Sequence, residues 1–208
     1  MGRGVAVREE GTTVVRILGL GGSLREGSLS LAALRAALAA AERASAETRL
    51  LELRALPLPF FRGDFDTPDA YGPEAAAQIA RLLTEARRAD GLLWASPAYH
   101  GAVSGAFKNA LDFFQYLSRD EPSFLYGKVV GVLAVGLGTI GAVNVVAQLT
   151  QIAHALRAQV VPLTVPITFA GQHFDDRQTP DAPTAQRLAA LGAEIVAQAA
   201  PRGLKVEG

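Results

Sequence analysis

The 208-residue sequence contains no cysteine, and this absence removes a whole set of possible chemistries. Disulfides, thiolate nucleophiles, zinc fingers and cysteine-ligated iron–sulfur clusters all depend on thiol side chains. Whatever reaction this protein supports therefore proceeds without a thiol.

The sequence also lacks an excess of charge of either sign. Its 20 lysine and arginine residues balance 20 aspartate and glutamate residues. Nucleic-acid binding needs a basic surface that displaces counterions from phosphates, so no nucleic acid is expected as a partner. The same balance excludes an acidic carrier that steers towards basic partners. Because half of the residues are hydrophobic and only 19% are charged, the chain is expected to fold rather than to stay disordered.

Long uninterrupted hydrophobic runs are missing as well. Residues 129–156 contain no Asp, Glu, Lys or Arg, but glycines interrupt them, and Asn144, Gln148 and Gln151 then recur at helical spacing. A buried strand, a glycine turn and an amphipathic helix explain this stretch better than a membrane span, so no membrane is expected as a partner. Residues 1–13 carry charged side chains and no apolar run. We therefore expect no signal peptide and a cytoplasmic location.

What the sequence does contain is a regular alternation of short apolar runs with longer helical patterns. The runs that predict strands are residues 14–20, 49–53, 91–95, 128–135 and 160–166. The patterns that predict helices are residues 28–46, 74–88, 104–117, 142–156 and 184–199. Residues 54–72 contain two closely spaced prolines, at 57 and 59, and predict a long surface loop.

This alternation predicts βαβ units, and hence a doubly wound α/β domain whose parallel sheet is covered on both faces. No repeat or linker divides the chain, so residues 1–208 are expected to form one domain with loose tails at 1–13 and 201–208. In such sheets ligands bind beyond the carboxyl ends of the strands. The loops that follow the first, third and fourth strands are therefore the candidate site.

The loop after the first strand is rich in hydroxyl groups. Ser23, Ser28 and Ser30 accompany Arg25 where a helix is predicted to begin. Several hydroxyl donors, one guanidinium and the positive end of a helix dipole are the groups that bind a terminal phosphate monoester. Alternatively, Ser28 or Ser30 only caps the helix, which would explain one serine but neither Ser23 nor Arg25.

The loop after the fourth strand runs from Gly136 to Gly141 and matches the GxGxxG pattern of dinucleotide-binding sites. That fingerprint also requires an acidic residue at the end of the next strand, where it binds a ribose. Residues 159–162 are Gln-Val-Val-Pro, so the acid is missing. A tight turn whose backbone approaches a ligand is therefore favoured over a direct dinucleotide site.

The most specific stretch follows the third strand and runs from Trp94 to Asp112. Together with Gly22-Ser23-Leu24-Arg25 and the serines after it, this stretch resembles the NADPH-dependent FMN reductase family, which includes quinone, chromate and azo-dye reductases. The resemblance covers residues 14–170. The motif residues that the chain shares with the family are Pro97, Tyr99, Gly101, Gly105, Lys108, Asn109 and Asp112.

The resemblance implies a flavodoxin-like three-layer sandwich with a five-stranded parallel sheet of order 2-1-3-4-5 and a bound FMN. The residues implied to hold the FMN phosphate are Ser23, Arg25, Ser28 and Ser30. Those implied to run along the ribityl chain and the isoalloxazine are Pro97, Ala98, Tyr99 and His100, and those that border the other side of the ring are Gly136 and Gly138. Leu29 and Gly101 complete the expected cofactor-binding residues. No catalytic side chain is expected, because hydride chemistry belongs to the flavin.

Three positions depart from the family pattern. In the first loop Ser30 stands where the family often has Asn, and two other departures matter more. The family's usual Glu is Ala98 here, and its usual Asn is His100. In the family much of the flavin contact is made by the main chain, so FMN binding is still expected. The departures bear instead on redox tuning, subunit contacts or access for the second substrate.

These features predict an FMN-dependent NAD(P)H oxidoreductase. NADPH or NADH would deliver hydride to the flavin and leave, and a small acceptor (free flavin, quinone, metal oxyanion or azo compound) would then occupy the same face in a ping-pong mechanism. The alternative is a flavodoxin-type electron carrier, which the neutral charge disfavours because carriers usually dock by charge. The resemblance also implies a homodimer or homotetramer with the flavin near the interface.

Several side chains have two interpretations at this point. Tyr99 packs either on the flavin or beneath its own loop. Lys108 meets either a nicotinamide phosphate or, four residues on, Asp112. The phenylalanine pair at 60–61 lines either a substrate pocket or a dimer interface. Residues 173–176, His-Phe-Asp-Asp, predict a solvated turn rather than a metal site, and no metal is expected.

Overall fold

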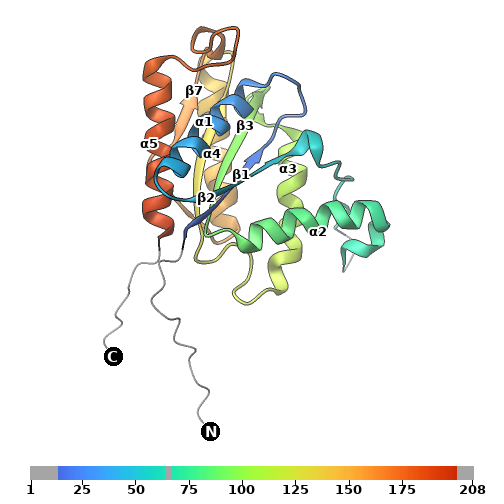
Figure 1. Cartoon of the computed structure of the whole chain (residues 1–208). Helices are drawn as coiled ribbons and strands as arrows, with labels where there is room; N and C mark the ends of the chain where they lie inside the picture. Colours follow the sequence, from blue (N-terminus) through green and yellow to red (C-terminus); the bar gives the residue numbers. More distant parts are fainter. Residues whose placement is uncertain (1–13, 64–66, 201–208) are drawn as a thin grey trace, which may run out of the picture.

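The computed structural model describes residues 14–63 and 67–200, in which a mostly parallel sheet is covered by helices (Figure 1). The tails expected at 1–13 and 201–208 lie outside the described residues. The strands are β1 (Arg16–Gly21), β2 (Glu47–Glu52), β3 (Gly91–Tyr99), β4 (Ala102–Val103), β5 (Val129–Val135), β6 (Gln159–Val160) and β7 (Val165–Ile167). None of the helices within the described ranges is long and apolar enough to cross a membrane.

The main path through the sheet is β2-β1-β3-β5-β6, with all neighbours parallel. This is the flavodoxin-like order, and it confirms the order 2-1-3-4-5 that was expected for the five predicted strands. The one antiparallel strand, β4, pairs with the end of β3.

The fifth predicted strand, residues 160–166, is divided in two. β6 pairs with Val129 and Val130, whereas β7 pairs with residues 133–135 at the other end of β5. Between these two pairings the ladder is interrupted after the Val161 nitrogen, which still donates to the Val130 oxygen at 3.0 Å. Pro162 lies in this interval, and a proline has no N–H to donate to a neighbouring strand.

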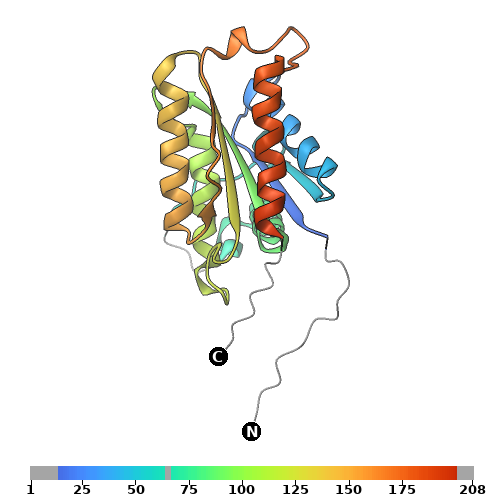
Figure 2. The same ribbon diagram turned by 90° about the vertical axis from the view of Figure 1, so that its left-hand side faces the viewer.

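The helices form a layer on each face of the sheet, as Figure 2 shows edge-on for α4 and α5. One layer contains α1 (Leu29–Arg43) and α5 (Ala182–Ala199), and the other contains α2 (Pro73–Arg88), α3 (Gly105–Asp112) and α4 (Thr139–Ala155). Along β3, Leu92 and Trp94 face the second layer while Leu93 and Ala95 face the first. Both faces are covered, so the central strands are apolar throughout instead of alternating.

The predicted helix at 104–117 ends early. α3 stops at Asp112, and a 3₁₀ helix, η3 (Phe113–Arg119), continues the chain. Phe113 is buried in it and meets Phe61 edge-to-face, with ring centroids 5.4 Å apart. This contact anchors the segment predicted as a long surface loop, which contains two short 3₁₀ helices, η1 (Leu53–Ala55) and η2 (Pro68–Tyr71).

α1 and α5 pack closely because small residues face each other along their contact. A Cβ atom added to Gly192 of α5 would lie 2.8 Å from Ala40 Cβ and 3.0 Å from the Ala41 nitrogen on α1. It would also overlap the backbone oxygen of Ala37, and real Cβ atoms do not come that close to a helix backbone. Glycine at 192 is therefore what lets the two helices approach.

We predict that Gly192→Ala destabilises the protein, although alanine is the better helix former by about 1 kcal/mol. Overpacking of a tight core contact costs about 1–3 kcal/mol and outweighs that gain. Urea unfolding followed by circular dichroism measures the difference. Gly171→Ala is the matched control, since a Cβ there meets no atom within 4 Å. Equal stability of the two variants would contradict this account of the helix contact.

Candidate functional site

The predicted site residues gather at the carboxyl edge of the sheet, at the top of Figure 1. Parallel strands all end at this edge, so the loops after β1, β3 and β5 are brought side by side. A backbone hydrogen bond from the Gly22 nitrogen to the Ala95 oxygen (2.8 Å) joins the first two of these loops.

The loop after β1 places three serine hydroxyls in a buried position. Ser23, Ser28 and Ser30 are all buried, and the Ser28 and Ser30 hydroxyl oxygens lie 2.9 Å apart. Ser28 occupies the N-cap position of α1, yet its hydroxyl makes no capping hydrogen bond to the helix amides. Simple helix capping therefore does not account for these serines.

Arg25 supplies a positive charge to the same loop. Its side chain is exposed, and within the described part of the chain its guanidinium pairs with no carboxylate. The neighbouring Glu26 is instead directed to Arg54, 3.4 Å away. Since α1 begins at Leu29, a free guanidinium, three hydroxyls and the positive end of a helix dipole meet here. This combination suits a phosphate group.

The loop after β3 is a tight hairpin that the sequence did not reveal. Tyr99 pairs with Ala102 across a two-residue turn formed by His100 and Gly101. Both turn residues have positive φ, 52° and 78°, which is the pattern of a type I′ turn. Asparagine followed by glycine is favoured in such turns, and histidine is also enriched at positive φ. The departure at His100 is thus compatible with the hairpin.

A glutamine from α4 holds this hairpin in place. Gln148 accepts a hydrogen bond from the Val103 nitrogen and donates one to the Gly101 oxygen, both at 3.1 Å. Tyr99 is 51% exposed, so it does not pack beneath its own loop. The hairpin consequently presents its backbone and the Tyr99 ring at the edge where the other loops meet.

Ser104 connects the hairpin to the loop after β1. Its hydroxyl donates to the Gly22 oxygen (2.6 Å) and accepts from the Phe107 nitrogen, and its own N–H donates to the Ser96 hydroxyl (3.1 Å). Both serines are buried. Sequence reasoning missed Ser96 and Ser104 as site-forming residues, and only the position of Ser104 before a helix signalled its capping role.

The loop after β5 lies against the hairpin. A Cβ added to Gly141 would be 3.1 Å from Ala98 Cβ, and one added to Gly136 would be 3.5 Å from it. Gly136 also exchanges backbone hydrogen bonds with Ile167 and Ala170, while Gly138 is exposed at the start of α4. All twelve predicted cofactor-binding residues therefore lie on the three adjacent loops or the strand and helix ends that border them.

The split of the fifth strand determines which residues could supply the acid that a GxGxxG site needs. Residues 159–162 lie near the amino end of β5, not at the carboxyl edge. The residues that follow β7 at that edge are Thr168 and Phe169, and neither is acidic. The ribose-binding acid of a dinucleotide site is therefore missing at the structurally relevant position too.

Two other predicted side chains have local partners. Lys108 forms the expected ion pair with Asp112, at 2.6 Å. His173 Nδ1 lies 2.8 Å from Asp181, whose carboxylate also caps α5 by accepting from the Thr184 nitrogen. The hydrogen bond from His173, together with those from Thr184, lowers the pKa of Asp181 to about 2. Among the described residues no group of three or more His, Asp or Glu side chains is arranged to hold a metal ion.

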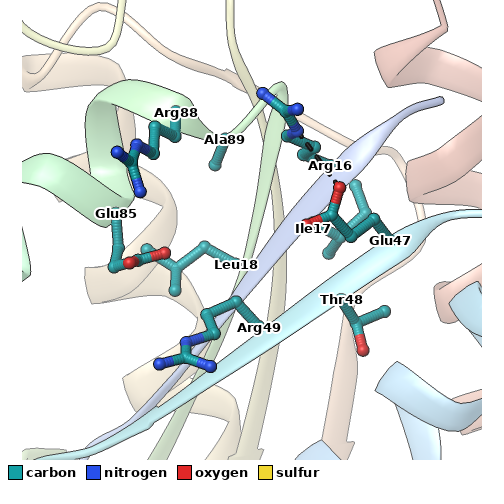
Figure 3. A pocket seen from close by; sticks show the side chains of 9 residues that line it. All are labelled: Arg16, Ile17, Leu18, Glu47, Thr48, Arg49, Glu85, Arg88 and Ala89. Atoms are coloured by element: carbon teal, nitrogen blue, oxygen red, sulfur yellow. Dashed lines mark hydrogen bonds and ion pairs between the residues drawn. The ribbon is translucent and has the colours of Figure 1, made fainter. Parts of the chain in front are cut away.

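A concave region at the opposite edge of the sheet contains none of the predicted site residues (Figure 3). It measures about 540 Å³ and lies over the amino ends of β1 and β2, beside the last turn of α2. Arg16 pairs there with Glu47 at 3.2 Å, and Arg49, Glu85 and Arg88 complete a mixed-charge lining. Opposite charges are interspersed, so this region has no clear preference for a ligand of one sign.

Residues 15–172 match the family described as NADPH-dependent FMN reductase. An NADPH azoreductase of a Bacillus species is 34% identical over 121 residues, 57% of this chain and 59% of the azoreductase. The matched part thus spans less than two thirds of that relative. A quinone reductase of Escherichia coli is 30% identical over 151 residues, 71% of this chain and 73% of the relative.

A solved structure with a similar fold is that of FerB, a flavoenzyme NAD(P)H:(acceptor) oxidoreductase from Paracoccus denitrificans. The two chains superpose with a TM-score of 0.69 over 89% of this chain and 97% of FerB. Their sequences are 22% identical, so this likeness concerns the fold.

We predict that the two turn positions of the hairpin respond in opposite ways to substitution. His100→Asn should keep or slightly raise stability, because asparagine adopts positive φ more readily. Gly101→Ala forces a side chain into that region and should cost about 1–2 kcal/mol. Thermal unfolding of both variants beside the parent protein tests this. An equally stable Gly101→Ala variant would show that the turn is not of this type.

Proposed function

The chain belongs to the NADPH-dependent FMN reductase family, and we propose that it is an FMN-containing oxidoreductase that passes electrons from NAD(P)H to a small acceptor. The observation that carries the proposal is the loop after β1. Three buried serine hydroxyls, a guanidinium that pairs with no carboxylate in the described part of the chain, and a helix N-terminus lie together on this loop, and helix capping does not account for the serines. The matched relatives, named as an azoreductase and a quinone reductase, agree with an oxidoreductase.

We assign the FMN phosphate to this loop. Ser23, Ser28 and Ser30 would donate hydroxyl hydrogen bonds to its oxygens, and Arg25 would neutralise its charge. The start of α1, at Leu29, would add the positive end of the helix dipole. The serines are already held in place by burial, so binding would order little more than the Arg25 side chain.

We assign the ribityl chain and the ring to the hairpin and the loop after β5. Pro97, Ala98, Tyr99, His100 and Gly101 offer mainly backbone atoms at this edge. Gly136 and Gly138 offer the backbone of the second loop, with no side chain in the way. Recognition through backbone groups explains how Ala98 and His100 can replace the family's usual residues without loss of binding.

The bound FMN would accept a hydride equivalent from NAD(P)H and pass electrons on to the acceptor. The protein's part is to bind, orient and tune. α3 begins directly after Ser104, and the positive end of its dipole favours negative charge beside the hairpin. The hydrogen bonds of Ser104 tie the hairpin to the loop after β1, and those of Gln148 tie it to α4, so the loops that would hold FMN stay at fixed positions.

We further propose that donor and acceptor use one site in turn, in a ping-pong mechanism. The GxGxxG loop lacks the acid that a separate dinucleotide site needs. One cofactor would occupy the three loops at the carboxyl edge together. The donor would then have to leave before the acceptor reaches the same face.

A homodimer or homotetramer is the proposed assembly. Leu137, Ile140 and Val143, on the loop after β5 and the first turns of α4, are 84%, 70% and 50% exposed. Such a contiguous apolar group beside a site suits coverage by a second copy. Burial of this patch would place the partner subunit next to the cofactor.

A flavodoxin-type electron carrier is the second candidate, because it shares the fold and would use the same phosphate loop. Carriers usually recognise their partners through complementary charge. This chain has 20 basic and 20 acidic residues, so its net charge does not favour a partner of either sign. An enzyme that acts on small molecules needs none.

The purified protein should be yellow with bound FMN, and NADPH or NADH added without oxygen should bleach it within seconds. Absorbance near the flavin maximum in an anaerobic stopped-flow instrument measures the reaction. A preparation that takes up no FMN would refute both candidate functions. Flavin that binds but stays oxidised for minutes would leave only the electron carrier.

Arg25→Ala should weaken FMN binding by about 10- to 100-fold, the loss expected when a charge-assisted hydrogen bond to phosphate is removed. Fluorescence titration of the apoprotein with FMN measures the affinity, and riboflavin, which has no phosphate, should bind both proteins equally. Arg43→Ala is the control, since Arg43 is exposed at the other end of the same helix. Unchanged FMN affinity in Arg25→Ala would overturn the phosphate assignment.

A further inference from the structure

A fourth segment of the chain borders the proposed FMN site. Residues 168–181 connect β7 to α5 at the top of Figure 2, and we call them the connecting segment. Its start is fixed to the loop after β5, because the Ala170 nitrogen donates to the Gly136 oxygen at 3.0 Å. Further along, it touches the loop after β1, where a Cβ added to Gly27 would lie 2.8 Å from Gln178 Nε2.

Local hydrogen bonds give the middle of the connecting segment a fixed shape. The Asp175 carboxylate accepts from the nitrogens of Arg177, at 3.0 Å, and of Thr179, at 2.7 Å. The carbonyl oxygen of Asp175 accepts from the Gln178 nitrogen at 2.8 Å. The backbone that presents Gln178 is therefore ordered by bonds of its own and needs no ligand to form.

Gln178 is an unusual residue for its position in this turn. Its φ is 63°, in the region that suits glycine and strains other residues. Among the described residues its half-buried side-chain amide forms no hydrogen bond. Backbone strain of this kind is found preferentially at functional sites. Neither the backbone conformation nor a hydrogen bond of the fold explains a glutamine here.

The side-chain nitrogen of Gln178 lies beside the part of the loop that would hold the phosphate. Gly27 stands between Arg25 and Ser28, two of the residues assigned to the phosphate, and it has no side chain that would keep Gln178 away from them. A side-chain amide nitrogen donates two hydrogen bonds, and phosphate oxygens accept them. The contact thus adds a hydrogen-bond donor next to the hydroxyls and the guanidinium of this loop.

From this contact we propose that Gln178 donates a hydrogen bond from its side-chain amide to an oxygen of the FMN phosphate. The proposal rests on the proposed function, because it requires FMN in the loop after β1. Gln178 would be a ligand from outside the three loops. The connecting segment would then help to retain the cofactor, although it belongs to none of the motifs that indicated the site.

Gln178→Gly should weaken FMN binding by about 10-fold, the loss expected for one hydrogen bond to a charged group. Riboflavin, which has no phosphate, should bind the variant and the parent protein equally. Thermal unfolding of the apoprotein should occur at the same or a higher temperature, because glycine adopts positive φ without strain. A residue that only supports the fold would behave differently, with lower stability and equal losses for FMN and riboflavin.

Gln178→Glu should weaken FMN binding by about 100-fold, because it removes the donor and places a negative charge beside the phosphate. Gln159→Glu is the matched control. It makes the same change of charge at an exposed position of β6, near the amino end of β5, and should leave the FMN affinity unchanged.

Fluorescence titration of the apoproteins with FMN and with riboflavin measures these affinities. Unchanged FMN affinity in both Gln178 variants, with Arg25→Ala still weakened, would overturn this inference and leave the proposed function intact. An equal loss of affinity for FMN and riboflavin would overturn it as well. A parent protein that binds no FMN would refute the proposed function and this inference together. Weaker binding of FMN alone in both variants supports the inference even if NADPH fails to reduce the flavin, a result that would refute only the reductase.

Discussion

The hydrogen bond from the Ser104 hydroxyl to the Gly22 oxygen joins the parts on which this site depends. It is short, buried and made between residues far apart in the sequence, one after β1 and the other after the β3–β4 hairpin. Leaving the buried Gly22 carbonyl without this donor would lower the stability of the folded protein by about 1–3 kcal/mol. The same serine caps α3, so the loop after β1, the hairpin and the helix behind them share one fixed point.

Much of the fold follows from local sequence patterns. The apolar runs and helical spacings predict the main strands and helices in the right order, because a parallel sheet covered on both faces needs continuous apolar strands. Local spacing also predicts that the serines and Arg25, next to a helix start, bind a phosphate; the structure places them on one loop, and the binding itself stays a prediction. What local patterns miss are partners distant in the chain. Gln148 on α4 and Asn109 on α3 bind backbone groups 47 and 50 residues away, and no spacing rule reports such pairs.

The failures at element boundaries also have physical causes. The last strand is divided at Pro162, which cannot donate to the ladder, so residues 159–162 lie near the amino end of β5 and the chain reaches the carboxyl edge only at β7. α3 stops early where aromatic side chains pack with the segment after β2, a tertiary contact that outweighs helix propensity. The hairpin was hidden because its turn is His-Gly, and the usual sequence signal for such a turn is Asn-Gly or Asp-Gly.

The two hydrogen bonds of Asn109 determine which positions of the segment after β2 can change without cost to the fold. Its side-chain amide pairs with this segment as a neighbouring strand would. It donates to the Pro59 oxygen and accepts from the Phe61 nitrogen, two residues further on. The spacing between positions 59 and 61 is thereby constrained, while the side chain between them is left without a structural task. Position 60 can therefore vary in size and polarity at little cost to the fold, so substitutions there alter the surface beside α3 and leave the backbone that Asn109 fixes unchanged.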